Sequence, residues 1–449
     1  MFIPPTITPP GRPLGVFDSL REVRRNVLSI IPAISFTQPI VTGTTGPARW
    51  HMVQGPEGMQ RIFRDNADNY PKSEVMIRML RPAVGASLFT AEGANWRWQR
   101  RAISPVFAPR NVDSLAPMMT ATAERTCQRL AEAGGQAEMV SEMLSATFDV
   151  ICEVALSGRD HFDAEAYGAA ITRYFLTVGR ASLLDFLELP PWVPRPGEVL
   201  GRGAVKTMHR MVTRAIEARR REGPRGDSDL LDYMLNAEDP QTGRRMTERD
   251  LLHNMQFFIV AGHETTALAL SWSLYLLANS LTLQDQLRTQ AQSVLKGRAA
   301  GAEDIKEMAL IEAVLNETMR LYPPVGFLAR NVLKPDQIYD REIRPRDTVF
   351  LNIWAMHRHH DLWQEPDAFD PERFSTENNA KRDKFQFVPF GAGPRICVGA
   401  NFALMQAGII LATLISRFRF EPTGQVPEPV MHMTIRPEPG VNLLVTPVS

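Results

Sequence analysis

Cysteine is scarce in this 449-residue chain, which has only Cys127, Cys152 and Cys397, far apart and without a CxxC pair. A disulfide framework or a thiolate zinc site needs several cysteines at short, regular spacings. Both are therefore excluded, and a reducing compartment is expected. Net charge is lacking as well, because fifty basic residues balance fifty acidic ones. Nothing in the overall charge favours nucleic acid or a strongly charged substrate.

Leader-like and membrane-spanning segments are also missing from the start of the chain. Prolines interrupt the first seventeen residues, and no basic stretch followed by an apolar one is visible. The apolar run 27–36 contains Pro32 and is shorter than the roughly 20 residues that a spanning helix needs. We expect a cytoplasmic protein without a transmembrane anchor. The amphipathic segment 20–28 leaves a peripheral membrane contact open.

Proline is absent between Pro240 and Pro323. Because a proline inside a helix costs about 3 kcal/mol, this gap predicts uninterrupted helices. Residues 250–281 are apolar on nearly every face, which predicts one long helix through the centre of the protein. A membrane span is the competing interpretation, but His263 and Glu264 lie in the middle of the segment and disfavour it.

The regions around this segment complete the fold prediction. After Pro323, the runs 325–333 and 347–356 have β-type composition and are separated by turn residues, which predicts a small sheet. Residues 400–420 are again helical, the last thirty residues resemble short strands, and the first half is mostly helical. No repeat or long polar linker divides the chain. We predict a mainly α fold with small β-sheets (α+β), in a single domain over residues 1–449.

The stretch FGAGPRICVG, residues 390–399, surrounds one cysteine with turn-forming residues. Cys397 is followed at once by an apolar helix, whose N-terminal amides and dipole favour thiolate over thiol. Gly393 and Gly399 permit backbone conformations or close approaches that a Cβ would block. Arg395 adds positive charge. The loop therefore suits an anionic sulfur beside a large, flat group.

Several roles are open to a cysteine. A packed small hydrophobe is the default, and Cys127 and Cys152 fit it, since they lie on helical faces among apolar neighbours. A nucleophilic Cys397 would need a histidine base, and the sequence between His360 and His432 contains none, although a remote one could fold nearby. A zinc site at Cys397 would need further ligand side chains. Axial ligation of a haem iron needs a single thiolate, which favours this role.

The stretch 390–399 resembles the haem-binding signature of the cytochrome P-450 family, with Phe390, Gly393, Arg395, Cys397 and Gly399 at its defining positions. Four further segments resemble family motifs in the family's order. They are WRWQR around Trp96 and Arg100, AGHETT at 261–266, ETMR with Glu317 and Arg320, and DPERF at 370–374. The resemblance covers essentially the whole chain and implies the cytochrome P-450 fold, with a long central helix over a haem and a cysteine-ligand loop.

The resemblance assigns roles around a haem b. Cys397 is implied as the metal ligand, and Glu264 and Thr265 as the catalytic pair that delivers protons for cleavage of O2. Ala261 and Gly262 are expected to be small because the helix passes over the macrocycle. The implied cofactor-binding residues are Trp96, Arg100, Ala261, Arg330, Phe390, Gly393, Arg395 and Gly399. His263 points to another face of the helix, so a ligand role is not expected.

Glu317 and Arg320 lie three residues apart on a predicted helix and project from one face. An ordinary surface pair, worth a few tenths of a kcal/mol, is the plain alternative. The resemblance instead joins both residues to Arg373 in a buried structural network that braces the cysteine loop.

The implied activity is that of a monooxygenase, which inserts one oxygen atom from O2 into a hydrophobic substrate by hydroxylation or epoxidation. A fatty acid or similar aliphatic chain is the first expectation, and steroids, terpenes and aromatic compounds stay open. The expected substrate contacts are Phe89, Phe257, Phe258, Val325, Phe327 and Met433, with others in the PPW connector at 190–192. Alternatives are a haem-thiolate peroxygenase or isomerase that needs no redox partner, and a haem sensor or carrier.

The chain leaves no length for a fused reductase after its last strands, so we expect a separate ferredoxin or flavodoxin and a reductase, with electrons from NAD(P)H. Basic residues could dock such an acidic partner, or they could be ordinary solvated charges. They are Arg97, Arg101, Arg110, Lys381, Arg382, Lys384, Arg417 and Arg419. We further expect a bacterial monomer that binds no nucleic acid.

Overall fold

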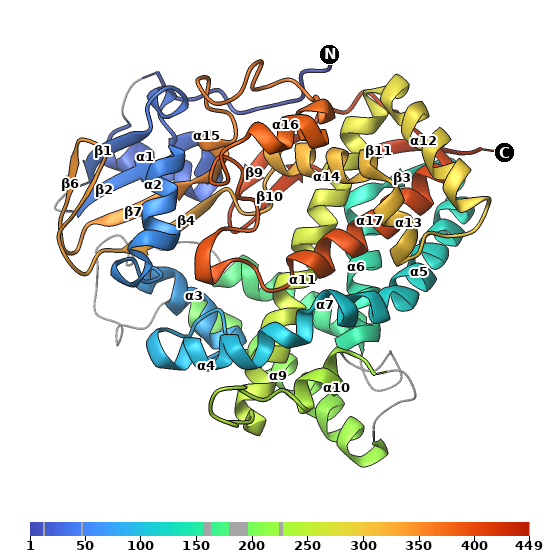
Figure 1. Ribbon diagram of the computed structural model, residues 1–449, viewed down its shortest axis with the longest axis horizontal. Coiled ribbons are helices and arrows are strands. Elements are labelled where there is room, and N and C mark those ends of the chain that lie inside the picture. Colours follow the sequence, from blue (N-terminus) through green and yellow to red (C-terminus); the bar gives the residue numbers. More distant parts are fainter. Residues whose placement is uncertain (12–13, 46–47, 156–162, 179–195, 224–227, 449) are drawn as a thin grey trace. The chain divides into compact units, whose positions relative to one another are not determined.

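The computed structural model describes residues 1–11, 14–45, 48–155, 163–178, 196–223 and 228–448 (Figure 1). These residues form two compact units. The first comprises Met1–Ser73, Met119–Leu144 and Thr265–Ser449, and the second comprises Glu74–Met118 and Ser145–Glu264. Action as a single catalytic domain over residues 1–449 stays a prediction.

A four-stranded sheet in the first unit has the order β1-β2-β7-β4. Strand β1 (Ile40–Thr45) pairs antiparallel with β2 (Ala48–Val53), which runs parallel to β7 (Thr348–Asn352). Strand β4 (Phe327–Asn331) is antiparallel to β7 and closes the sheet. Val53, Val349 and Leu351 are buried in the core beneath it. The sheet predicted to follow Pro323 is thereby confirmed, with its two runs as neighbouring strands.

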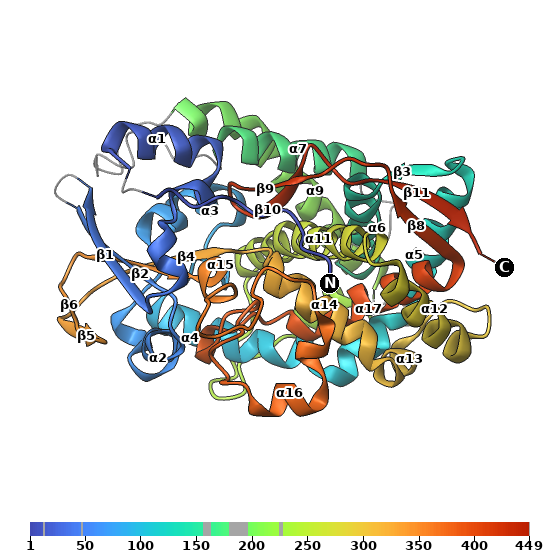
Figure 2. The ribbon, with the colours of Figure 1, turned by 90° about the horizontal axis from the view of Figure 1, so that it is seen from above.

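Three smaller sheets complete the β structure of the first unit. Strand β11 (Asn442–Pro447) lies between β3 (Gln136–Glu138) and β8 (Phe418–Pro422), as Figure 2 shows near the C-terminus. Two hairpins pair β9 (Glu428–Met431) with β10 (Ile435–Glu438), and β5 (Asp336–Ile338) with β6 (Arg341–Ile343). The short strands expected near the end of the chain are therefore present.

The central helix α11 (Glu248–Ala278) has 31 residues and begins in the second unit and ends in the first. Its bounds agree closely with the predicted helix at 250–281. Trp272 on its last turns stacks on Tyr322, with the ring centroids 3.6 Å apart. Both side chains are fully buried, which fits a core helix rather than a membrane span.

The other helices of the first unit are mostly short and connect the sheets. Two of them, α14 and α17, pack against each other beside the cysteine loop. The α-helices are α1 (Val16–Arg25), α2 (Pro56–Gln60), α12 (Leu281–Leu295), α13 (Ala302–Glu307), α14 (Ala309–Leu321), α15 (Ile353–Met356), α16 (Thr376–Lys381) and α17 (Ala400–Arg417). The tighter or wider turns are η1 (Val27–Ile30), η2 (Ala33–Phe36), η3 (Arg61–Asp65), η4 (Ala67–Asn69), η6 (Pro371–Phe374) and η7 (Gly393–Arg395).

The second unit is helical in its described part. It contains α3 (Glu74–Val84), α4 (Gly93–Ile103), η5 (Ser104–Phe107), α7 (Ala164–Thr177), α9 (Pro196–Glu222) and α10 (Leu230–Leu235), with parts of α5 (Pro109–Glu132) and α6 (Met139–Ala155). A Cβ added at Gly201 would lie 2.7 Å from a methyl carbon of Val178, so α9 approaches the end of α7 closely. The PPW connector lies outside the described residues.

Among the described residues, α17 is long and apolar enough to cross a membrane by composition, but 61% of it is buried inside the protein. Helices α11 and α12 pass the same test only as a pair that is bent by 114°. Burial is the behaviour of core helices, so the composition of these segments is explained by packing.

Candidate functional site

Cys397 is exposed at the end of a loop that leads directly into α17. Its backbone N–H donates a hydrogen bond to Phe390 O at 2.9 Å, and Ile396 N–H donates to Gly393 O at 3.1 Å. These two hydrogen bonds join backbone groups within the loop. Cys397 precedes Ala400, the first residue of the 18-residue helix α17, by three positions. The positive end of the helix dipole favours the thiolate form of such a cysteine.

The glycines of the loop have different roles. Gly393 has φ +68°, and a Cβ there would lie only 2.0 Å from Phe63 O, so both conformation and space require glycine. Gly391, which the sequence interpretation did not single out, has φ +69°. Gly399 has φ −93°, which any residue adopts, so no unusual conformation is needed there. The prediction is confirmed for Gly393 but not for the conformation of Gly399.

Glu317 and Arg320 form a fully buried pair, as the family motif predicts and unlike a surface pair. Arg320 Nε and Nη2 donate to the two carboxylate oxygens of Glu317 at 2.7 and 2.8 Å. The remaining N–H groups of Arg320 donate to three backbone carbonyls, those of His357, Pro366 and Ala368. All five guanidinium donors are thereby satisfied. Arg373 Nε lies 3.4 Å from Glu317, so the predicted three-residue cluster is present.

His357 connects this cluster to the cysteine loop, and the sequence interpretation missed it. Its ring Nε2 accepts a hydrogen bond from Val388 N–H at 3.1 Å, while its carbonyl accepts from Arg320. Val388 O in turn accepts from Gly391 N–H at 3.0 Å. Burial lowers the pKa of His357 to about 3, so the ring is neutral and Nε2 stays an acceptor. The Glu317–Arg320 ion pair is thus connected to the cysteine loop through the carbonyl of His357 and the backbone N–H of Val388.

We expect His357→Ala to weaken the loop, because Val388 N–H would be left buried without its acceptor, at a cost of roughly 1–3 kcal/mol. The pH dependence should change too. The unfolded ring binds a proton below its ordinary pKa of 6.5, whereas the folded ring does so only near 3. This histidine therefore destabilises the protein increasingly as the pH falls from 6.5 towards 3.

Urea unfolding of wild type and His357→Ala at pH 7 and pH 5 checks this expectation. At pH 7 the free energy of unfolding should be lower for the variant than for wild type. Between pH 7 and pH 5 it should fall by less in the variant. His360→Ala serves as the control, because its side chain is exposed and its backbone N–H donates to Phe36 O rather than to the cysteine loop. Equal pH slopes for wild type and His357→Ala would contradict the role of His357.

The AGHETT segment lies where α11 passes from the second unit to the first. Glu264 is buried, with 5% of its surface exposed. Thr265, the next residue, shares a small cavity of about 30 Å³ with Phe390, enclosed by α11, α14 and α17. The structure therefore brings the hydroxyl-bearing end of the segment beside the residue that begins the cysteine loop.

Two neighbours in this segment have packing roles. A Cβ added at Gly262 would lie 3.0 Å from Ile151 Cδ1, so close packing against α6 explains this glycine. The expectation that Gly262 provides clearance for a macrocycle stays a prediction. His263 lies edge-on to Phe148 at 5.6 Å, and its Nδ1 is 3.0 Å from Ile259 O. The expectation that His263 is not a ligand stays a prediction.

The residues predicted to bind the carboxylates of a haem are found in both units. Trp96 and Arg100 are half-buried one turn apart on α4. Arg330 on β4 is 6% exposed, and Arg395 in the cysteine loop is half-buried. Lys72, which the sequence did not reveal, is 9% exposed and forms an antiparallel bridge with Arg330. Directly paired residues of this kind project from the same face, which places two buried cations side by side.

Three of the predicted substrate contacts form an aromatic cluster in the second unit. The rings of Phe89 and Phe257 are 5.6 Å apart, and those of Phe257 and Phe258 are 5.3 Å apart. Phe258 is buried against Phe107 at 5.1 Å, so its role includes core packing. In the first unit Val325, Phe327 and Met433 are partly exposed.

Most of the basic residues expected to dock a redox partner have partners within the chain. Arg101 is bidentate to Asp239, Arg417 to Glu124, and Arg419 lies 3.2 Å from Asp285. Lys381 pairs with Glu377, and Arg382 lies over the Phe374 ring. Arg97, Arg110 and Lys384 are exposed.

The residues at the cysteine loop fit a haem better than another metal site. Among the described residues, no three His, Cys, Asp or Glu side chains are grouped to hold a metal ion. Cys397 therefore offers one sulfur alone, as axial ligation requires. The other cysteines are buried, and burial raises the pKa of Cys127 to about 11, which makes it a poor thiolate.

Comparison with known proteins agrees with this geometry. A profile of the family described as Cytochrome P450 matches residues 9–445. The protein LUTEIN DEFICIENT 5, chloroplastic, of Arabidopsis thaliana is 28% identical over 90% of this chain and 71% of its own length. Cyclooctatin synthase of Streptomyces melanosporofaciens is 26% identical over 99% of this chain and 94% of its own length.

Among solved structures, the crystal structure of the cytochrome P450DA heme domain superposes with a TM-score of 0.82 and 25% identity. It covers 91% of this chain and 90% of that one. The predicted α+β fold with small sheets is confirmed. Since the family profile extends over nearly the whole sequence and the fold agrees, the chain belongs to the cytochrome P450 family of haem-dependent monooxygenases.

Proposed function

We propose that this monooxygenase inserts one oxygen atom of O2 into the C–H or double bond of a hydrophobic substrate, with a fatty acid or similar aliphatic chain as the first candidate. The observation that carries the proposal is the exposed Cys397, held by the Phe390 carbonyl just before the N-terminus of α17. Incorporation of an atom from isotopically labelled O2 into product, dependent on a reductant, tests it. Product without the label would contradict it.

Cys397 would be the axial ligand of haem b, and the haem would supply O2 binding and thiolate-assisted O–O cleavage. The chain holds the cofactor in place. Arg330 and Arg395 are suited to its carboxylates because guanidinium groups bind carboxylates bidentately. Trp96 and Arg100 would add further contacts from α4. Phe390, next to the loop, would lie near the sulfur, and Ala261 near the haem face.

Glu264 and Thr265 would manage the protons that O2 cleavage consumes. Thr265 lines the cavity beside Phe390, and its Oγ1 would hold a proton donor in place. The buried Glu264 carboxyl, one residue earlier on the same helix, can pass protons inward through ordered water. This division of roles argues against a peroxygenase or a haem sensor, which would not use proton delivery.

Replacing Thr265 by Ala is expected to uncouple the enzyme. The fraction of NAD(P)H oxidation that yields product should fall by about tenfold or more, because a positioned proton donor contributes roughly 100-fold or more to a rate. Peroxide should rise correspondingly. Thr265→Ser keeps the hydroxyl and should retain most of the coupling. Equal coupling in wild type and Thr265→Ala would remove this residue from proton delivery.

The substrate proposal follows from the apolar character of the residues that are expected to contact the substrate. Phe89, Phe257, Val325, Phe327 and Met433 offer partly exposed apolar side chains, which suit a hydrophobic ligand. A spin-state titration of the haem across fatty acids, terpenes and steroids discriminates between the classes. A fatty acid should give the tightest low-to-high-spin shift. A tighter response to a terpene or a steroid would replace the fatty acid as the substrate class.

Electrons would come from NAD(P)H through a separate ferredoxin or flavodoxin and its reductase, in a cytoplasmic, bacterial, monomeric protein. Arg97, Arg110 and Lys384 are exposed cations suited to an acidic partner. Turnover with peroxide alone, at the rate of the complete electron-transfer system, would favour the peroxygenase instead.

A further inference from the structure

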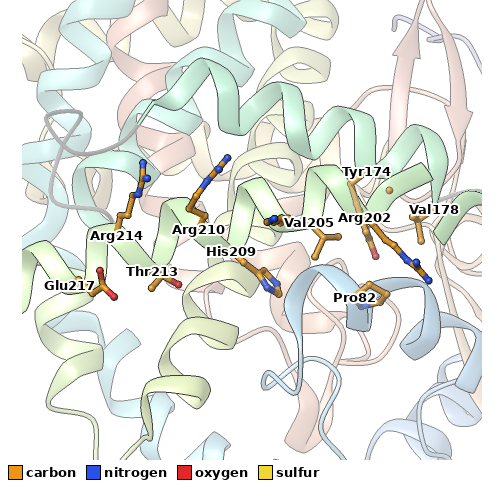
Figure 3. Close-up of a pocket in the computed structure, with 12 residues that line it drawn as sticks. Pro82, Tyr174, Val178, Arg202, Val205, His209, Arg210, Thr213, Arg214 and Glu217 are labelled. Carbon is orange, nitrogen blue, oxygen red and sulfur yellow. The ribbon is translucent and has the colours of Figure 1, made fainter. Parts of the chain in front are cut away.

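A groove of about 650 Å³ follows one face of α9 in the second unit (Figure 3). Pro82 of α3 bounds it on one side, and Tyr174 and Val178 at the end of α7 bound it on the other. None of its lining residues belongs to the proposed haem site. The groove is therefore a feature that the monooxygenase reaction does not explain.

Helix α9 lines the groove with two parallel rows of side chains at four-residue intervals. Residues four apart on a helix are neighbours on one face. Figure 3 shows Arg210 and Arg214 on one side of the helix axis, and His209, Thr213 and Glu217 on the other. The first row consists of Arg202, Lys206, Arg210 and Arg214, and the second of Val205, His209, Thr213 and Glu217.

The first row is cationic throughout and exposed. In the part of the chain that the structure describes, no carboxylate forms an ion pair with any of its four members. The same helix pairs two of its other cations, because Arg219 contacts Asp229 and Asp232, and Arg220 contacts Glu248. Like charges at four-residue spacing disfavour a helix. An anion that binds along the row would remove this repulsion.

One end of the groove is mainly apolar. Figure 3 shows Pro82, Val178 and Val205 there together with the Tyr174 ring, and Arg202 beside them. On the adjoining first turn of α9, Val199 and Leu200 are 49% and 61% exposed, which is unusual for large apolar side chains. An apolar end that continues into a row of cations is complementary to a molecule with an apolar chain and an anionic head.

We propose that the α9 groove binds a single-chain amphiphile with an anionic oxygen-acid head group. The chain lies against Pro82, Val178 and Val205, and the head lies on Arg210 and Arg214. The rise of 1.5 Å per residue places Arg214 about 13 Å beyond Val205, which leaves room for a medium-length chain. A cavity of this volume favours a discrete ligand over a flat membrane surface.

Calorimetric titration of the haem-loaded protein with dodecyl phosphate, below its micelle concentration, tests the proposal. Saturable binding is expected that weakens as salt is raised, since the cations are exposed. The double variant Arg210→Glu/Arg214→Glu should bind at least about tenfold more weakly. Val205→Trp, which fills the apolar end, should weaken binding without changing charge. Arg221→Glu alters an exposed arginine of the same helix outside the groove and should leave affinity unchanged.

Each other outcome would overturn the proposal. Undiminished affinity in the double variant would remove the cationic row from binding. Inorganic phosphate that binds as tightly as dodecyl phosphate would exclude the apolar contact. Binding to vesicles of anionic lipid without binding of the monomeric amphiphile would indicate membrane docking instead. The haem spin-state response to substrate should be the same in the double variant and wild type, so failure of the groove and failure of the proposed oxygenation are distinguishable.

Discussion

Cys397→Ser is expected to abolish oxygenation while the protein stays folded. Serine has nearly the same size, but its hydroxyl does not ionise near neutral pH and cannot replace a thiolate ligand. Because Cys397 is exposed, the exchange disturbs no core packing. Turnover should therefore fall to the background of free haem, with the free energy of unfolding of the haem-free protein within about 0.5 kcal/mol of haem-free wild type.

The other cysteines provide matched controls for this experiment. Cys127 and Cys152 are buried, and burial keeps the Cys127 thiol protonated through its raised pKa. Cys127→Ser and Cys152→Ser can destabilise the helices on which they lie, but the properly folded protein should retain oxygenation. Substantial turnover by Cys397→Ser, or its loss in a folded Cys127→Ser protein, would contradict the assignment of the ligand.

Glu317→Ala is expected to have the largest effect on stability. The exchange would leave the Arg320 guanidinium charged and fully buried, with two of its five donors lacking acceptors. Removal of one partner from a buried ion pair costs about 3–5 kcal/mol. Asp370 N–H, which donates to Glu317 at 2.9 Å, would lose its acceptor too. Urea unfolding measures the loss.

Arg344→Ala is the control for this prediction. Arg344 forms an exposed pair with Glu342 in which both side chains are more than 60% accessible, so its removal should cost less than about 1 kcal/mol. Arg320→Lys separates charge from geometry, since an ammonium with three donors cannot reach the five positions that Arg320 serves. Similar losses for Glu317→Ala and Arg344→Ala would show that the cluster does not brace the fold.

The sequence predicted the parts of the site that depend on local spacing. The turn chemistry around Cys397, the three-residue interval between Glu317 and Arg320, and the proline-free segment of α11 are all encoded within short stretches. Local pattern therefore sufficed for the long central helix, for the sheet after Pro323 and for the candidate ligand.

The remainder of the site depends on contacts between distant segments. His357 meets Val388 across 31 positions, and Gly393 meets Phe63 across a much longer separation, so neither contact has a local signal. Gly262 packs closely against Ile151 on another helix, and this contact has no local signal either. The ion pairs of Arg101 and Arg417 depend on distant carboxylates in the same way, so the sequence alone did not reveal them.

The absorption spectrum of the reduced, haem-loaded protein with CO tests the central claim most directly. Ligation by the Cys397 thiolate predicts the Soret band that is typical of thiolate-bound haem, and predicts its absence from folded, haem-loaded Cys397→Ser. A band typical of histidine ligation in the wild type, or a thiolate-type band that persists in Cys397→Ser, would contradict the account.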